Sequence, residues 1–242
     1  MFPLPYPPPI DAILAALFGL VPVSLFVGLL FGRPAADQSG RLPRWLRLLV
    51  SAAVTFAALL FWFGRGAGAT NGFARLIGFG MVAGFLGDLI MARIIRVPHR
   101  LGCGMLVFGV GHAFYIKAFL WLLDTLPEHS LAVARFSAAG TVLFAVLGWY
   151  FWIRNPDGPA TLNWASMGYA GLVGSMAGIA LAVGFVDPSF RPLALGAGLF
   201  LASDFLLGNW QIRGHAYRSV NDAIWLTYAM GQLLIVYSNA LV

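Results

Sequence analysis

Three ionisable side chains, Asp88, His112 and Asp204, lie inside long apolar segments of a chain that keeps most of its other charged residues in short polar stretches. An ionisable group inside a membrane is costly, so several such groups usually face one polar cavity and mark a functional site. Aspartate and histidine are also side chains that transfer protons in acid–base catalysis and in proton relays. The sequence therefore predicts catalysis or transport within a membrane.

The composition indicates an integral membrane protein. Of the 242 residues, 60% are hydrophobic and only 10% are charged, which lies outside the range of soluble globular domains. Apolar runs of the length that spans the hydrocarbon core occur at about 10–32, 46–64, 72–93, 101–123, 130–153, 162–185, 192–212 and 219–240. The predicted fold is an all-α polytopic membrane protein of eight transmembrane helices, which form a single domain over residues 1–242.

The arginines are distributed unevenly between the two ends of the predicted helices. The connections after the first, third, fifth and seventh helices carry Arg33, Arg41, Arg44, Arg47, Arg93, Arg96, Arg100, Arg154, Arg213 and Arg218. The opposite side carries only Arg65, Arg75, Arg135 and Arg191. Because cytoplasmic loops accumulate Arg and Lys, both termini are predicted to be non-cytoplasmic, in a bacterial cytoplasmic membrane. The net charge of +6 then implies contact with anionic lipid headgroups and not with nucleic acid.

The two halves of the chain contain similar short motifs. The third and seventh predicted helices each place an Asp after a small residue in an apolar frame, as Gly87-Asp88 and Ser203-Asp204. The following helix carries a polar pair each time, His112 with Tyr115 and Tyr228 with Gln232. Four helices separate the copies, an even number that preserves orientation. The sequence thus predicts two parallel four-helix halves.

Depth along the helices decides whether the polar residues can meet. At a rise of 1.5 Å per residue, Asp88 lies roughly 8 Å and Asp204 roughly 13 Å from the Arg-rich ends of their helices. On the same scale His112, Tyr228 and Gln232 lie at roughly 17, 14 and 20 Å, in the cytoplasmic half or near the midplane. One shared cavity that opens toward the cytoplasm is therefore predicted.

Each of these residues also has a purely structural interpretation. Asp88 can form an interfacial ion pair with Arg93 or Arg96, and His112 can serve as a neutral hydrogen-bonding group between helices. The polar side chains Tyr115, Asn221, Tyr228 and Gln232 are typical of helix contacts or cavity lining. Asp222 is either a charge at a helix N-terminus or a residue at the cavity rim. Lys117, about 140° around the helix from His112, is expected to face away from the site.

Four short motifs resemble the YhhN family of membrane proteins, which includes the lysoplasmalogenases. They are Gly87-Asp88, Gly104-x-x-x-Phe108-x-x-Gly111-His112-x-x-Tyr115-x-x-x-Phe119, Phe200-x-x-Ser203-Asp204 and Tyr228-x-x-x-Gln232. The resemblance covers the third to the eighth helix. It implies an eight-helix fold and hydrolysis of the vinyl ether bond of a lysophospholipid, without a cofactor, to a fatty aldehyde and a glycerophospho-alcohol. The chain departs from the family where the second helix opens, with Leu42-Pro43-Arg44 in place of a Lys-Pro step.

That reaction needs groups of the kind found here. An enol ether is hydrolysed by protonation of the carbon β to the ether oxygen, and water then captures the resulting oxocarbenium-like cation. A general acid and a negative or water-orienting partner are required, and glycosidases use two carboxyl groups for a similar cation. The deeper Asp204 is the candidate acid, and Asp88, nearer Arg93, is the candidate carboxylate. The expected supporting residues are His112, Tyr115, Ser203, Asn221, Tyr228 and Gln232 for protons, water and substrate, and Arg93, Arg96 and Arg100 for the lipid phosphate.

Other classes of protein remain as alternatives. A proton-coupled transporter or lipid permease also uses buried Asp and His, although no helix carries a paired Gly and Pro break at the midplane. An intramembrane zinc hydrolase needs about three converging ligands, whereas only His112 among the four histidines lies in the predicted interior. A non-catalytic lipid-binding protein leaves the two buried aspartates without a task.

Overall fold

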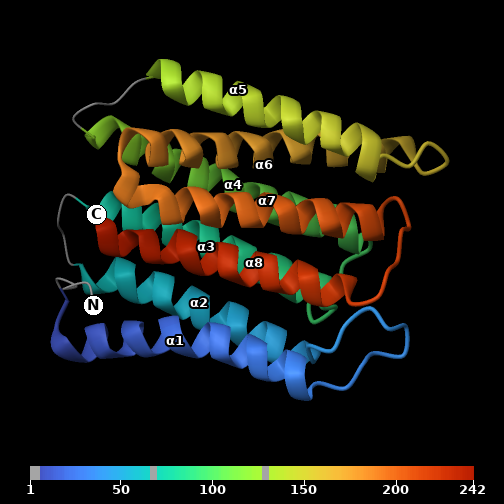
Figure 1. Ribbon diagram of the computed structural model, residues 1–242, viewed down its shortest axis with the longest axis horizontal. Coiled ribbons are helices and arrows are strands. Elements are labelled where there is room, and N and C mark those ends of the chain that lie inside the picture. Colours follow the sequence, from blue (N-terminus) through green and yellow to red (C-terminus); the bar gives the residue numbers. More distant parts are fainter. Residues whose placement is uncertain (1–5, 66–69, 127–130) are drawn as a thin grey trace.

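The computed structural model describes residues 6–65, 70–126 and 131–242. Within these ranges every regular element is a helix and the chain forms no strand (Figure 1). The elements are α1 (Pro8–Phe31), α2 (Arg44–Gly64), α3 (Asn71–Met91), α4 (Arg100–Thr125), α5 (Leu131–Gly148), α6 (Ala160–Val186), α7 (Arg191–Gln211) and α8 (Val220–Tyr237), with the shorter η1 (Trp149–Ile153), η2 (Pro188–Phe190) and η3 (Ser238–Leu241).

The predicted all-α fold is confirmed. In the described ranges seven helices, α1 to α7, are long and apolar enough to cross a membrane. The eighth, α8, carries Asn221, Asp222 and Gln232, which lower its hydropathy, and it packs against α7, α2, α3 and α1. Hydropathy placed the helix ends well but missed two changes of helix type, since α5 continues as the π-helix η1 and α8 as the 3-10 helix η3.

The helices run side by side, and the N- and C-termini lie at one end of the bundle (Figure 1). In each half of the chain consecutive helices pack on one another, from α1 to α4 and from α5 to α8. The halves meet where α4 packs on α6 and where α8 packs on α2, α3 and α1. A two-fold relation between the halves would exchange the α4–α6 contact with the α8–α2 contact, whereas the contacts of α8 with α3 and α1 have no counterpart of similar extent.

Glycines on α3 and α4 bring these helices close together. A Cβ atom at Gly111 would lie 2.9 Å from the backbone oxygen of Gly80, and one at Gly80 would collide with the ring of Tyr115. Small residues at such positions let membrane helices approach. This close packing sets the distance between the helices that carry Asp88 and His112.

The end of the bundle opposite the termini is held by Asp222 of α8. Its buried carboxylate accepts hydrogen bonds from the backbone N–H groups of Arg41, at 2.7 and 2.8 Å to its two oxygens, and Leu42, at 2.9 Å. Of the two interpretations of Asp222, a helix charge or a rim residue, neither describes this role: it fixes the α1–α2 connection. That connection leads directly into α2, whose first turns carry Arg44 and Arg47.

Candidate active site

A cavity of about 250 Å³ lies at the end of the bundle opposite the termini, between α2, α3, α4, α7 and α8. Both Asp88 and Asp204 line it. The cavity is therefore at the Arg-rich end, where the depth estimates placed it. Its charged and polar lining comprises Arg44, Arg47, Asp88, Arg93, Arg100, Ser203, Asp204, Gln211, Asn221 and Tyr228.

Asp88 of α3 is almost completely buried and accepts two hydrogen bonds on one oxygen. The hydroxyl of Ser51 on α2 donates to Oδ2 at 2.5 Å, and that of Tyr228 on α8 donates to the same oxygen at 2.7 Å. Behind Tyr228, the hydroxyl of Tyr115 donates to Oε1 of Gln232 at 2.7 Å. Because an ionised carboxylate accepts hydrogen bonds without donating any, this environment suits Asp88 as a carboxylate.

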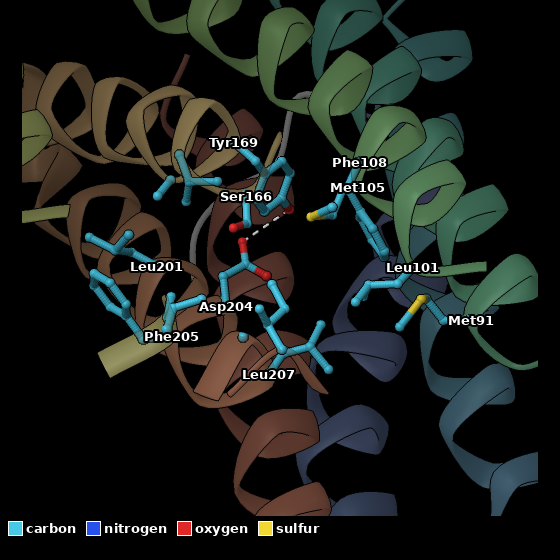
Figure 2. A pocket seen from close by; sticks show the side chains of 15 residues that line it. Met91, Leu101, Met105, Phe108, Ser166, Tyr169, Leu201, Asp204, Phe205 and Leu207 are labelled. Atoms are coloured by element: carbon cyan, nitrogen blue, oxygen red, sulfur yellow. Dashed lines mark hydrogen bonds between the residues drawn. The ribbon is translucent and has the colours of Figure 1, made fainter. Parts of the chain in front are cut away.

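Asp204 of α7 has fewer partners. The Tyr169 hydroxyl on α6 lies 3.1 Å from its Oδ2, the contact drawn in Figure 2. Nε2 of His112 on α4 lies 3.1 Å from the same hydroxyl and 3.8 Å from Asp204 Oδ2. The other ring nitrogen of His112, Nδ1, lies 3.2 Å from the sulfur of Met176. His112 is thus fully buried behind Asp204 and reaches it mainly through Tyr169.

The two carboxyl groups have equivalent surroundings in the two halves of the chain. Each is contacted by the second helix of its own half, Ser51 on α2 or Tyr169 on α6, and by the fourth helix of the other half, Tyr228 on α8 or His112 on α4. The spacings agree, because 204 − 88 and 228 − 112 both equal 116. The difference between the halves is chemical: a Tyr hydroxyl faces Asp88 where an imidazole faces Asp204.

Arginines surround the mouth of the cavity. Nη1 of Arg47 donates to Oδ1 of Asn221 at 2.9 Å, and its guanidinium lies 5.4 Å from the ring centre of Trp225. Its Nε is buried and has no hydrogen-bond partner among the described residues. Arg93, just after α3, adopts the left-handed region, with φ of 59°, a conformation that costs energy for a residue other than glycine. The site thus offers guanidinium donors to an anion.

A second, smaller pocket adjoins the cavity, between α4, α6, α7 and η1 (Figure 2). Asp204 and Phe108 line both spaces. Apart from Asp204, Tyr169 and Ser166, the side chains of this pocket are apolar, among them Leu101, Met105, Ile153, Val173, Leu201 and Phe205. The π-helix η1 contributes Ile153 to this lining. Its Trp149 also donates from Nε1 to the hydroxyl of the lining residue Ser166 at 2.9 Å. Asp204 therefore stands between a charged cavity and an apolar pocket.

The structure brings together most of the residues expected from the sequence. The cavity is lined by Asp88, Asp204, Ser203, Asn221, Tyr228, Arg93 and Arg100. His112, Tyr115 and Gln232 are fully buried behind it, where they contact lining or neighbouring polar groups. Arg96 is exposed in the α3–α4 connection and is not among the residues that line the cavity. Lys117 is exposed, as predicted.

Four contributors escaped the sequence analysis as site residues: Ser51, Tyr169, Met176 and Arg47. Ser, Tyr and Met are common in apolar helices, so nothing in their type singles them out. Arg47 was assigned only to the positive-inside distribution. One signal could have pointed to Tyr169 in the sixth helix. Adding the 116-residue spacing between the two halves to the position of Ser51 gives a position two residues before Tyr169. Among the described residues, no three His, Cys, Asp or Glu side chains come close enough to hold a metal ion.

The fold and cavity define a helical membrane protein with two aspartates in one buried polar site. The profile of the YhhN family matches residues 45–239, so the chain belongs to the YhhN family, as the motifs indicated. No curated protein and no solved structure matches the chain.

Proposed function

We propose that this protein hydrolyses the vinyl ether bond of lysophospholipids of the lysoplasmalogen type. One observation carries the proposal: two carboxyl groups line a single cavity that has arginines at its mouth and an apolar pocket beside one of the carboxyl groups. A proton-coupled transporter or lipid permease also uses buried carboxyl groups, and it differs from the hydrolase in releasing no product. Membership of the YhhN family agrees with this function.

The shape and charge of the site suit an amphipathic lipid with one chain. The lipid phosphate would bind the guanidinium groups of Arg47, Arg93 and Arg100. The first carbons of the alkenyl chain would lie in the apolar pocket between α4, α6 and α7, which has a volume of only about 40 Å³, and the rest of the chain would extend into the lipid. The vinyl ether, which joins chain and headgroup, would then lie near Asp204, the polar residue common to both spaces.

The two aspartates would divide the chemistry between them. Asp204 gives its proton to the carbon β to the ether oxygen, which leaves an oxocarbenium-like cation. Water adds to that cation and loses a proton to the Asp88 carboxylate, giving a hemiacetal. The hemiacetal collapses when its hydroxyl proton passes to Asp204 and Asp88 protonates the ether oxygen, so the carbon–oxygen bond breaks. Aldehyde and alcohol leave, and both side chains regain their starting protonation states.

The partners of each carboxyl group support this assignment. Two hydroxyl donors on Asp88 match a group that is ionised before the reaction and can then accept a proton from water. Asp204 has one hydroxyl at 3.1 Å and adjoins the apolar pocket, where an ionised carboxyl group is costly. A neutral acid beside the chain and a carboxylate toward the headgroup are the arrangement that enol ether hydrolysis requires.

The direct test is to incubate the purified protein in detergent with vinyl ether, ester and alkyl ether lysophospholipids and to measure released aldehyde. We expect aldehyde from the vinyl ether and no product from the alkyl ether, which lacks the double bond that accepts the proton. Absence of product from all three substrates, together with uptake driven by a pH gradient in proteoliposomes, would replace this proposal with the transporter.

Arg47 provides a prediction about the headgroup. Arg47→Gln removes a cavity guanidinium, and the loss of charge-assisted hydrogen bonds to phosphate should raise KM by about 10- to 100-fold, with a smaller effect on kcat. The measurement is the dependence of aldehyde release on substrate mole fraction in mixed micelles. Arg96→Gln is the matched control, because Arg96 is an exposed arginine outside the cavity; a KM effect of the same size there would contradict a specific phosphate site.

The arginine asymmetry gives a prediction about orientation. We propose that both termini are outside the cytoplasm of a bacterial cell, and that the connections with Arg41 and Arg96 are inside. In a Cys103→Ser background, single cysteines placed in these connections should resist an impermeant thiol reagent added to intact cells and react after the cells are opened. Labelling in intact cells would place the mouth of the cavity on the outer face.

A further inference from the structure

Four side chains form a chain of contacts that ends at Asp204. Met176 Sδ lies 3.2 Å from His112 Nδ1, His112 Nε2 lies 3.1 Å from the Tyr169 hydroxyl, and that hydroxyl lies 3.1 Å from Asp204 Oδ2. Met176 and His112 have relative exposures of 0% and 1%, so water does not supply alternative partners. The two ring nitrogens of His112 must therefore be satisfied by Met176 and Tyr169.

The number of protons that these groups carry determines which group donates and which accepts in each contact. A thioether sulfur accepts hydrogen bonds but has no proton to donate. The proton of a neutral His112 therefore sits on Nδ1, facing Met176, and Nε2 becomes an acceptor. Tyr169 then donates its single hydroxyl proton to Nε2. Its oxygen remains an acceptor toward Asp204, and only a neutral carboxyl group has a proton to donate.

An ionised Asp204 fits this arrangement less well. Tyr169 would have to turn its hydroxyl to the carboxylate, which leaves His112 Nε2 buried without a donor. The same number of protons also permits an imidazolium facing a carboxylate, with 3.8 Å between His112 Nε2 and Asp204 Oδ2. That ion pair separates charge at a site whose ring neighbours include Phe200, 4.7 Å from His112 between centroids, and burial of a weakly hydrogen-bonded ion pair is unfavourable.

We propose that Met176 fixes the tautomer of His112 and, through Tyr169, holds Asp204 as a neutral carboxylic acid. Met176, His112 and Tyr169 are on this view positioning residues, and Asp204 is the group they prepare. The use of that proton in catalysis rests on the function proposed above, but the protonation state itself does not.

The loss of the proton from Asp204 changes the contacts for as long as the carboxylate exists, and it leaves His112 Nε2 without a donor during that time. When the O–H bond of Asp204 breaks and the new C–H bond forms on the substrate, Tyr169 rotates its hydroxyl from His112 to the new carboxylate. The rotation reverses when Asp204 regains a proton. The ionisable groups that contact Asp204 or share its cavity are Tyr169, His112, Arg44, Arg47, Asp88, Arg93, Arg100 and Tyr228. None of them is changed by substitution of Met176.

Infrared spectroscopy tests the protonation state without substrate. A neutral carboxylic acid has a carbonyl stretching band that a carboxylate lacks, and the difference between wild type and Asp204→Asn isolates it. We expect the band at neutral pH.

In Met176→Leu, a nearly volume-conserving change, His112 is free to carry its proton on Nε2 and to support an ionised Asp204. The band should then disappear at a pH lower by about half to one unit, the effect of one buried hydrogen bond.

Met81→Leu is the matched control, since Met81 is also fully buried and its sulfur lies 3.6 Å from a tyrosine hydroxyl, that of Tyr115. It should leave the band's pH dependence unchanged. Nitrogen NMR of labelled histidine in wild type, assigned with His112→Gln, should show the Nδ1–H tautomer, a test that does not depend on the folding of any Met176 variant.

The proposal is overturned if the Asp204 band is absent in wild type, if His112 carries its proton on Nε2, or if Met176→Leu titrates like Met81→Leu. None of these measurements involves turnover. Failure to release aldehyde with these spectra intact would contradict the hydrolase and leave the hydrogen-bond chain established.

Discussion

Replacing Asp204 by Asn is expected to lower turnover of a vinyl ether lysophospholipid by about 100-fold or more, the usual contribution of a general acid. Asp88→Asn should have an effect of similar size, because the neutral amide cannot accept the proton of the attacking water. The two residues act in one sequence of proton transfers, so the double variant should be little worse than the worse single one. Aldehyde release under saturating substrate is the measurement.

Lys117→Met serves as the control for this pair. It also removes a charge from a transmembrane helix, but Lys117 is exposed and lies outside the cavity, so turnover should be nearly unchanged. Near-normal turnover in either Asp variant, on protein whose size-exclusion profile matches wild type, would contradict the two-carboxylate mechanism. His112 would then be the principal candidate for proton transfer.

Asp222→Ala is expected to destabilise the protein strongly without touching the reacting groups. The carboxylate is buried and accepts backbone hydrogen bonds from Arg41 and Leu42. Loss of two charge-assisted hydrogen bonds should cost roughly 3 kcal/mol or more, which corresponds to a fall in apparent Tm of about 10 °C for a protein of this size. Thermal unfolding in detergent, followed by loss of the monodisperse peak, measures it.

Asp37→Ala provides the comparison in the same connection. Asp37 also accepts a backbone hydrogen bond, from Ser39 at 3.0 Å, but it is exposed, so its loss should change the apparent Tm by only a degree or two. Asp222→Asn, which keeps one acceptor oxygen, should fall between the two. Equal effects of Asp37→Ala and Asp222→Ala would show that the burial of Asp222 does not matter.

The helices and the depth of the two aspartates could be predicted because both follow from the order of residues along the chain. A run of apolar residues marks a helix wherever it packs, and the depth of Asp88 or Asp204 follows from a count along that run. When a helix is apolar on all sides, its sequence does not show which face contacts which neighbouring helix. Ser51, Tyr169 and Met176 are functional candidates only because the packing of α2 and α6 turns Ser51 and Tyr169 toward the aspartates and Met176 toward His112.

The arginines illustrate the same point. Arg47 and Arg96 both belong to the Arg-rich side, and composition treats them alike. Packing separates them, because Arg47 lies within the first two turns of α2 and lines the cavity, whereas Arg96 lies in an exposed connection. The π-helix at Trp149 was also beyond prediction, since its residues have the same apolar character as the helix before it.

The long-range partners of α8 have a consequence for how the protein is made. Tyr228 follows Asp88 by 140 positions, and Asp222 follows Leu42 by 180. During synthesis α3 therefore enters the membrane long before one of the two hydroxyl donors to its aspartate exists. The α1–α2 connection likewise lacks its acceptor until Asp222 of α8 has been synthesised. A chain that stops before α8 would keep the seven apolar spans described from α1 to α7 and still lack a completed site, so α8 is the helix that closes the structure.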